Sequence, residues 1–402
     1  MHTSLSTRVQ RIKPSTTLAV SARAAALKAS GLDIIGLGAG EPDFDTPEHI
    51  KRAAIEAIEQ GFTKYTAVEG IISLRMAIVQ KFAHDNQLTF DTNQILVSCG
   101  GKQSFFNLTQ ALLDADDEVI IPAPYWVSYP DIVLLADAHP VIIPTDVEQH
   151  FKITPEQLEN AITPKTKLFV INSPSNPTGI AYTRQELTAL AAVLLKHPQI
   201  FIATDDMYEH ILWRKEPFSN ILMVCPELYS RTIVLHGVSK TYAMTGWRIG
   251  YAAGPKDLIQ AMSNIQGQST SNPCSISQKA ALAALTGDQT CVHTMVSAFK
   301  ERHDFVVQAL NQIPGITCMA GDGTFYAFPK IQAVIDKMQA LGMSHIHNDT
   351  DFSEFLLQEA QIAVVPGAAF GAPGYIRLSF ATSLDVLKEA MRRLSTCINN
   401  VK

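Results

Sequence analysis

The stretch His236–Pro255, HGVSKTYAMTGWRIGYAAGP, decides the fold and the chemistry that we expect of this chain. It begins just after residues 232–235, a mostly apolar run with three β-branched residues that is typical of a buried strand. Lys240 comes just past the predicted end of this strand, and Arg248 follows within the same stretch. We therefore expect a lysine and an arginine close together at the mouth of a sheet.

A lysine and an arginine placed in this way suit pyridoxal phosphate (PLP). The amine of a lysine at the end of a strand can form a Schiff base with the aldehyde of PLP. The planar guanidinium of Arg248 can hold the phosphate with paired hydrogen bonds. The alternative interpretation is a surface lysine and a structural arginine beside a glycine-rich turn, and this stretch alone leaves that alternative open.

The composition indicates a folded chain of two or three domains. The 402 residues are 47% hydrophobic, which is enough for a sizeable core, and 17% charged, which is too few for a disordered chain. The net charge of −6 gives no reason to expect nucleic acid or an anionic membrane as a partner. A run of about 18 apolar residues is absent, so the sequence predicts no membrane span.

The cysteines predict neither a metal site nor a redox motif. None of the six forms a C-x-x-C pair, and scattered cysteines without an export signal are typical of reduced thiols in the cytoplasm. The N-terminal residues lack a continuous apolar core, so no signal peptide is predicted. The cysteines are Cys99, Cys225, Cys274, Cys291, Cys318 and Cys397.

Predicted strands and helices alternate through the first two thirds of the chain, which favours a mostly parallel α/β sheet. A long helix is predicted from about 277 to 312, and the α+β remainder is assigned to a second domain. We predict an N-terminal arm with part of the small domain (1–48), a large domain (49–290) and a C-terminal small domain (291–402). The predicted strands are 33–37, 94–97, 118–121, 168–171, 199–204 and 232–235; further predicted helices are 47–60, 70–84, 184–196, 256–266 and 351–360.

A glycine turn after the strand 94–97 predicts an anion site. The sequence continues with two glycines and then a helical pattern, so free N–H groups and the helix dipole point at one place. We assign the PLP phosphate to Gly101, Lys102 and Gln103. An ordinary strand-to-helix turn remains the alternative.

Acidic residues follow the buried strand 199–204. Asp205 is predicted to face the pyridine nitrogen of PLP, where a carboxylate keeps that nitrogen protonated. Tyr208 is predicted to hydrogen-bond the phenolic oxygen. Asp206 is the competing acid, and a metal or surface site is the alternative interpretation of this strand end.

Two further positions suggest contacts with a carboxylate. The glycine-rich residues 36–40 do not open a dinucleotide loop, because Glu41 and Pro42 follow, but a backbone N–H at Gly40 could approach a substrate. Arg377 lies in an apolar strand, where a charge needs a partner. A clamp on an α-carboxylate is the functional interpretation, and an internal ion pair is the alternative.

The segment Ser239–Gly250 around Lys240 resembles the PLP-lysine signature of class I aminotransferases. The segments GEPDFDTP (40–47), NSPSNPTG (172–179) and RLSFATS (377–383) resemble the same family. From about residue 8 onward the chain is similar to its bacterial and plastid-type aspartate aminotransferase subgroup. The resemblance implies PLP fold type I, with a mostly parallel seven-stranded sheet in the large domain and a smaller α+β domain. It also implies a homodimer with shared active sites.

The resemblance also implies roles that the residues alone do not give. Trp126, which by itself suggests core packing, would stack on PLP, and Asn176 would donate to the phenolic oxygen and to the substrate carboxylate. Tyr65 would reach the phosphate of the partner subunit. One departure is Gly237, where some relatives have a phosphate-binding serine, and whether Ser239 takes its place is left open. Cis bonds are expected before Pro124 and Pro177.

The implied reaction moves the amino group of L-aspartate to 2-oxoglutarate by a ping-pong mechanism, so the partners are amino acids and 2-oxo acids. In the subgroup, residues matching Lys102 and Thr17 contact the distal carboxylate, and a basic residue matching Lys13 is implicated with prephenate. The alternatives on this fold are an aromatic, alanine or prephenate aminotransferase and a β-lyase. A PLP-sensing regulator is disfavoured, because such a protein would carry an added DNA-binding domain.

Overall fold

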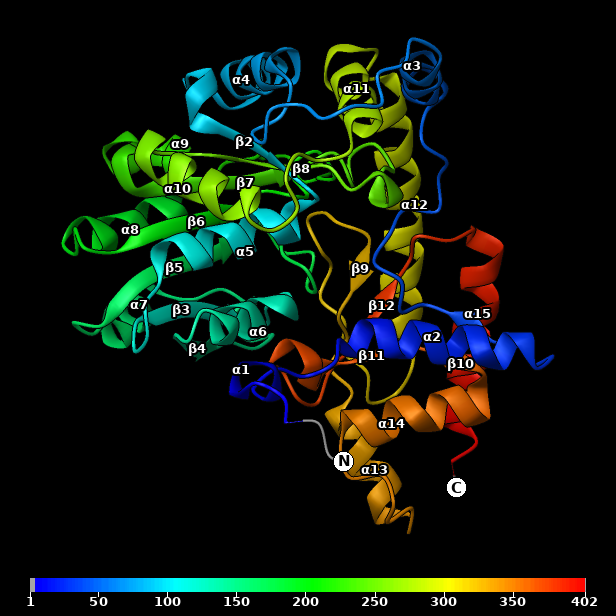
Figure 1. The fold of residues 1–402 in the computed structure, drawn as a ribbon. Helices are drawn as coiled ribbons and strands as arrows, with labels where there is room; N and C mark the ends of the chain where they lie inside the picture. The colour runs from blue at the N-terminus through cyan, green and yellow to red at the C-terminus, as the bar shows by residue number, and fades with distance from the viewer. Residues whose placement is uncertain (1–3, 402) are drawn as a thin grey trace.

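The computed structural model describes residues 4–401 and contains a large seven-stranded sheet with a smaller α+β part beside it (Figure 1). β8 runs antiparallel to both of its neighbours, and every other adjacent pair of strands is parallel. This confirms the predicted α/β fold with a mostly parallel seven-stranded sheet. The strand order is β2 (Ile95–Ser98), β8 (Gly250–Ala253), β7 (Thr232–Gly237), β6 (Phe201–Asp205), β5 (Thr166–Asn172), β3 (Glu118–Ala123) and β4 (His139–Pro144).

The strands are apolar because helices cover both faces of the sheet. All six residues of β7 are buried. Leu235 packs into a cluster with Phe105 of α5 (Gly101–Leu112), whereas Val234 packs with Phe82 of α4 (Ile72–Asn86) on the opposite face. Successive side chains of a strand point to opposite faces, so an unbroken apolar run is what a strand between two helical layers requires.

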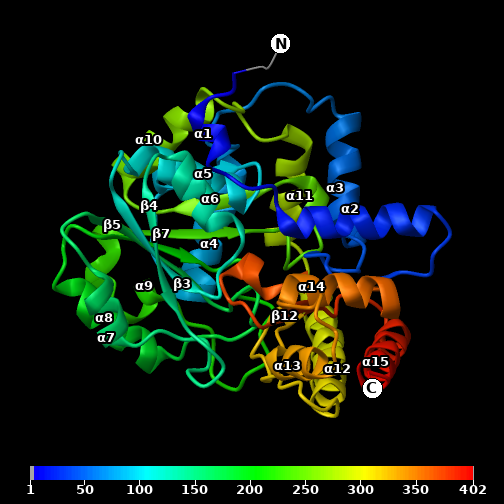
Figure 2. The ribbon, with the colours of Figure 1, turned by 90° about the horizontal axis from the view of Figure 1, so that it is seen from below.

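The smaller part combines the two ends of the chain. β1 (Ile35–Gly36) pairs with β10 (Ile362–Ala363), and α2 (Thr16–Ala29) contacts both of them. A second sheet has the order β11 (Val365–Pro366), β12 (Ile376–Ser379), β9 (Tyr326–Ala327). Figure 2 shows the helices of this part gathered beside the large sheet: α12 (Thr290–Asn311), α13 (Gln332–Ala340), α14 (Asp349–Phe355) and α15 (Leu384–Asn399).

The division into residues 1–48, 49–290 and 291–402 stays a prediction, and residues 1–3 and 402 lie outside the described residues. Within the described chain, no helix combines the length and the apolar character that crossing a membrane requires. The cis bonds expected before Pro124 and Pro177 are confirmed, and a third precedes Pro174.

Several predicted elements have different bounds. The single helix expected from about 277 to 312 is wrong: α11 (Ser275–Thr286) ends at Gly287, and α12 follows. A side chain at Gly287 would lie 2.6 Å from the carbonyl oxygen of Ala283, so this tight break requires glycine. The strand β4 was not predicted, because its sequence HPVIIP contains two prolines, which are tolerated only in edge strands such as this one. The other predicted elements correspond to β1, β2, β3, β5, β6, β7, α3 (Glu48–Glu59), α4, α8 (Arg184–Leu195), α10 (Lys256–Gly267) and α14.

The parallel strands end at one edge of the large sheet. Asn172 is the last residue of β5 and Asp205 the last of β6, and the two pair in register. β7 ends at Gly237, three residues before Lys240. In an open parallel sheet the carboxyl ends of the strands are where ligands bind, so the fold itself indicates where to look for a site.

Candidate active site

A cavity of about 490 Å³ opens at this edge, between the strand ends and α2. It gathers residues that are far apart in the sequence and that come from both the large sheet and the smaller part. The predicted site residues that line it are Thr17, Gly40, Gly101, Lys102, Trp126, Asn176, Asp205, Tyr208, Ser239, Lys240, Arg248 and Arg377.

Lys240 is carried to the cavity by the buried strand β7 and a following turn. Its Nζ donates a hydrogen bond to the carbonyl oxygen of Gly40. Burial, together with the charge of Arg377, lowers the pKa of Lys240 from 10.5 to about 8. The unprotonated fraction of this amine near neutral pH is therefore far larger than that of an exposed lysine, and an unprotonated amine is a nucleophile and a base.

The two neighbouring acids at the end of β6 point to different places. Asp205 lines the cavity; its carboxylate accepts from the hydroxyl of Tyr129 and, at 3.2 Å, from the backbone N–H of Met207. Asp206 instead accepts from the Thr204 hydroxyl and the Asn220 amide, both at 2.6 Å. Burial raises the pKa of Asp205 above its ordinary value, so a cationic partner would stabilise the ionised carboxylate.

Arg377 is a buried charge without an acidic partner. Its side chain is 2% exposed, and no carboxylate of residues 4–401 forms an ion pair with it. One nitrogen donates to Oδ1 of Asn176 at 3.0 Å and another to the carbonyl of Gly38 at 2.8 Å, whereas Nε has no partner in the described chain. The internal ion pair that was the alternative is therefore not what the described residues form, and the guanidinium is left to meet an anion.

The bond from Arg377 also fixes the amide of Asn176. Because Oδ1 of Asn176 accepts from the guanidinium, its Nδ2 is the group left to donate elsewhere. The backbone N–H of Asn176 donates to Oδ1 of Asn172 at 2.8 Å, and Nδ2 of Asn172 donates to the carbonyl of Asp205. Neighbouring strand ends thus hold one another in place.

The first turn of α5 and Arg248 form a positively polarised corner. Gly100 has a φ of +90°, and a side chain there would lie 2.3 Å from a nitrogen of Arg248. The missing side chain lets the guanidinium lie against the turn, where it donates to the carbonyl oxygens of Thr245 at 2.9 Å and Cys99 at 3.3 Å. Free N–H groups of a helix start beside an arginine are suited to a phosphate.

The cavity lining also carries groups that can meet the side chain of a ligand. The ammonium of Lys102 lies 5.3 Å from the ring centre of Trp126, and Trp126 packs edge-on against Tyr129. Oγ1 of Thr17 is buried without a hydrogen-bond partner in the described chain. Ser239 also lines the cavity, whereas a side chain at Gly237 would press on Gly250, which explains the glycine there.

Three predicted residues lie outside the cavity lining. The side chain of Gln103 accepts from the Cys99 N–H and donates to Thr270, and its own N–H donates to the carbonyl oxygen of Gly100. These groups are used within the protein, and the assignment of Gln103 to the phosphate stays a prediction. Lys13 is exposed on the N-terminal arm. Tyr65 is 91% exposed on the loop between α3 and α4, so it does not reach the cavity of its own chain.

Two tyrosines at the site were not predicted. Tyr129 holds Asp205, and Tyr326 lies with its hydroxyl 3.0 Å from that of Tyr208. Their partners are distant in sequence, and neither tyrosine stands in a pattern that indicates a functional site. The two tyrosines could be identified as site residues only once their spatial contacts with Asp205 and Tyr208 were known.

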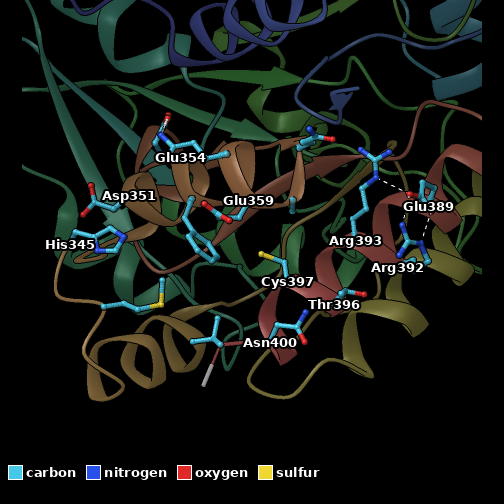
Figure 3. Close-up of a pocket in the computed structure, with 16 residues that line it drawn as sticks. His345, Asp351, Glu354, Glu359, Glu389, Arg392, Arg393, Thr396, Cys397 and Asn400 are labelled. Atoms are coloured by element: carbon cyan, nitrogen blue, oxygen red, sulfur yellow. Dashed lines mark hydrogen bonds and ion pairs between the residues drawn. The ribbon is translucent and has the colours of Figure 1, made fainter. Parts of the chain in front are cut away.

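A larger hollow, of about 980 Å³, lies elsewhere, between α14 and α15 (Figure 3). It contains none of the predicted site residues. Its arginines are already paired, because Arg392 and Arg393 both donate to Glu389 at 2.7–2.8 Å. The cavity at the strand ends, with its unpaired Arg377 and its buried amine, is therefore the candidate active site.

Comparisons of the sequence with known proteins identify the family of this chain. The family profile "Aminotransferase class I and II" matches residues 32–394. The chain is 60% identical to an aspartate/prephenate aminotransferase of Nitrosomonas europaea over 98% of this chain and 100% of that protein, and 55% identical to one of Cereibacter sphaeroides over 97% of each.

Two solved structures of aspartate aminotransferases resemble this chain in fold and in sequence. The aspartate aminotransferase of Rhizobium meliloti matches with a TM-score of 0.93 and 46% identity over 99% of each chain. The aspartate aminotransferase of Thermus thermophilus with maleate matches with a TM-score of 0.91 and 42% identity over 98% of this chain and 100% of that one. The family profile covers most of the chain, and the relatives match it nearly end to end. The chain therefore belongs to the class I and II aminotransferases.

Proposed function

We propose that this aminotransferase uses PLP to move the amino group of L-aspartate to 2-oxoglutarate, forming oxaloacetate and L-glutamate by a ping-pong mechanism. One observation carries the proposal: a buried amine (Lys240), a carboxylate (Asp205) and a guanidinium (Arg377) line one cavity, and the guanidinium has no acidic partner among residues 4–401. A similar set in a structural core would be paired internally, as buried charges normally are.

The residues present fit PLP. The glycine turn and Arg248 offer a phosphate corner, Asp205 suits a pyridinium nitrogen, and Lys240 suits an aldehyde. When bound, PLP supplies that aldehyde and an aromatic ring that draws electrons from the carbon to be deprotonated. Trp126 would cover one face of the ring, and Tyr208 would donate to its phenolic oxygen.

The side chains of the protein then have defined tasks. Arg377 binds the α-carboxylate of the substrate and thereby fixes its Cα, while Nδ2 of Asn176 donates into the same region. Lys240 takes the proton from Cα of the substrate and delivers it to the cofactor. The lowered pKa of Lys240 makes this transfer possible at neutral pH. Asp205 holds the proton on the ring nitrogen throughout.

A dicarboxylic preference is supported by two further residues of the cavity lining. Lys102 provides a positive charge and Thr17 a hydroxyl without a partner, and both suit the second carboxylate of aspartate or 2-oxoglutarate. The Thermus thermophilus enzyme was solved with maleate, which is also a dicarboxylate. Prephenate is a second candidate amino acceptor, favoured by the names of the relatives; Lys13 lies outside the cavity lining.

The proposal includes a homodimer with shared sites. Large apolar side chains are exposed on α3, on α4 and on the loop between them, which is unusual for a surface that stays in water. Tyr65 lies on the same loop and is free to reach a second copy. The exposed residues are Ile55, Ile58, Tyr65, Ile72 and Met76. The six free cysteines suit the reducing cytoplasm, where we place the protein.

The decisive experiment is a visible absorption spectrum of the PLP-loaded protein during titration with aspartate. We expect the band of the aldehyde form to be replaced by that of the amine form, and 2-oxoglutarate to restore the first band. A band that persists in saturating aspartate would reject aspartate as the substrate. Parallel titrations with alanine, phenylalanine and cystathionine distinguish the other reactions on this fold, and prephenate in place of 2-oxoglutarate tests the second acceptor.

A further inference from the structure

We propose that Tyr326 is a positioning residue of the active site: its hydroxyl supports the hydroxyl of Tyr208, and its ring supports the guanidinium of Arg377. The inference rests on the proposed PLP-dependent function and adds a residue to it. Tyr326 lies in β9 of the smaller part, lines the cavity and is 1% exposed. It therefore links the smaller part of the molecule to the strand ends of the large sheet.

The hydroxyl of Tyr326 lies within hydrogen-bond distance of one other side-chain hydroxyl in the described chain. It lies 3.0 Å from the hydroxyl of Tyr208. A side chain at Gly40 would come within 3.0 Å of it, so the glycine leaves room for this contact. The titratable groups that face this hydroxyl are Tyr208 from the turn after β6, Arg377 from β12 and Glu41 from the segment after β1.

The direction of this hydrogen bond follows from counting protons. A tyrosine hydroxyl has one proton to donate. If Tyr208 donates to the phenolic oxygen of the cofactor, it can only accept from Tyr326, so Tyr326 must be the donor between the two. Donation into a hydroxyl strengthens the bond that this hydroxyl itself donates. Tyr326 thus makes Tyr208 a better donor to the phenolic oxygen.

The ring of Tyr326 has a second task. The central carbon of the Arg377 guanidinium lies 4.3 Å from the ring centre of Tyr326 and 4.9 Å from that of Phe370. Two aromatic faces compensate a buried cation that has no acidic partner in the described chain, and they keep the plane of its donors fixed. The orientation of this plane determines how the substrate carboxylate is held.

The two tasks can be separated by substitution. Tyr326→Phe removes the hydroxyl and keeps the ring, whereas Tyr326→Leu removes both. Tyr375→Phe is the matched control, because Tyr375 is another buried tyrosine of the smaller part whose hydroxyl accepts from the Val147 N–H, away from the cavity. Thermal unfolding of each variant identifies any that fail to fold, and Tyr326→Phe, which changes one atom, keeps the test valid in that case.

The first readout is the pH midpoint of the visible band of the PLP-loaded protein. The bound cofactor holds a titrating proton next to its phenolic oxygen, and donors to that oxygen ease the loss of this proton. We expect Tyr326→Phe to raise the midpoint by about 0.3 pH units, as the loss of one cooperative bond in a chain implies, and Tyr375→Phe to leave it unchanged. An unchanged midpoint in Tyr326→Phe overturns the role of the hydroxyl.

The second readout is the KM for aspartate. We expect Tyr326→Phe to stay within about twofold of the parent protein, and Tyr326→Leu to raise KM about tenfold through the lost cation–π contact. An equal KM in the two variants overturns the role of the ring. If the parent protein itself gains no visible band with PLP, the proposed function fails; if it does, and the variants match it, only this inference fails.

Discussion

The hydroxyl of Tyr129, on α6 (Ser128–Leu135), donates a hydrogen bond to Oδ2 of Asp205, 76 residues away. Tyr129 is itself held between Phe105 and Trp126, whose rings pack edge-on against it at 4.9 and 5.2 Å. Burial raises the pKa of Asp205, and the hydrogen bond from Tyr129 opposes this effect. The tyrosine therefore favours the ionised form of the carboxylate, which is the form that would leave the proton on the ring nitrogen of PLP.

Tyr129→Phe should therefore lower kcat. Without the donor, Asp205 becomes a stronger base and draws the proton from the ring nitrogen, so the ring accepts electrons less well. We expect kcat for aspartate to fall about tenfold, the effect of one hydrogen bond to a charged group, with little change in KM. Steady-state kinetics measure this. Tyr251→Phe is the control, because the hydroxyl of Tyr251 lies near His236, away from the cavity; an equal loss in both variants would contradict the assignment.

The amine of Lys240 should react with PLP in a pH-dependent way. The pKa of about 8 means that the unprotonated, nucleophilic form grows as the pH rises from 6 to 9, well below the 10.5 of an exposed lysine. The rate of PLP uptake by the cofactor-free protein, followed by absorbance, should rise through a midpoint near pH 8. Because the charge of Arg377 contributes to the lowered pKa, Arg377→Met should move this midpoint upward. A midpoint that stays in place would show that burial alone sets the pKa.

Replacing Arg377 should weaken binding of every substrate. Arg377→Gln removes the charge that meets the α-carboxylate but keeps a polar side chain in the buried position. We expect KM for both aspartate and 2-oxoglutarate to rise about 100-fold, as loss of a bidentate, charge-assisted contact implies. Arg392→Gln, in the exposed pair with Glu389, is the matched control and should leave both values unchanged. Retention of normal KM values in Arg377→Gln would place the carboxylate elsewhere.

A buried ion pair beneath the site should contribute to stability. Lys81 of α4 contacts Glu209, which also bonds to His236 at 2.9 Å and Asn86 at 2.8 Å, and all four side chains are buried. Lys81→Met leaves the carboxylate of Glu209 without its cation, and we expect a loss of about 3–5 kcal/mol in the free energy of unfolding in urea. Adding Glu209→Gln should recover part of this loss, because no unpaired charge then remains.

The exposed pair Lys300–Asp304 provides the control: Lys300→Met should change the free energy of unfolding far less.

The buried cluster of Lys81, Glu209 and His236 also predicts how stability responds to acid. Burial and the charge of Lys81 lower the pKa of His236 from 6.5 to about 4. Although burial acts in the opposite direction, Lys81 and His236 hold the pKa of Glu209 below its usual 4.5. Both groups bind protons more readily when unfolded, so stability should fall as the pH drops below about 6.5. A flat profile between pH 7 and 4 would contradict the cluster.

The sequence predicted what depends on local patterns. Apolar runs followed by helical periodicity identified most strands of the large sheet, and polar residues just after those runs identified Asp205 and Lys240. Asp205, the last residue of β6, lines the cavity, whereas Asp206 bonds to Thr204 and Asn220 instead. The sequence predicted Asp205 and left Asp206 as the competing acid. Gln103 was assigned to the phosphate because it follows the glycine turn before a helix; its side chain bonds to Cys99 and Thr270, and the assignment stays a prediction.

What the sequence could not predict depends on contacts between distant segments. Tyr129 meets Asp205 and Tyr326 meets Tyr208 only after the sheets assemble, 76 and 118 residues apart along the chain. The edge strand β4 was obscured by its prolines, and the break at Gly287 was hidden within a continuous helical pattern. Tyr65 lies on an exposed loop, and its proposed role belongs to a second copy of the chain.

The central claim is that one amine, that of Lys240, carries the cofactor. Reduction of the PLP-loaded protein with borohydride fixes the cofactor covalently to the amine that holds it, and mass spectrometry of the digested protein locates the attachment. The account predicts one modified peptide, containing Lys240, and no stable modification in Lys240→Ala. Attachment at another lysine, such as Lys102 on the wall of the same cavity, would contradict the account.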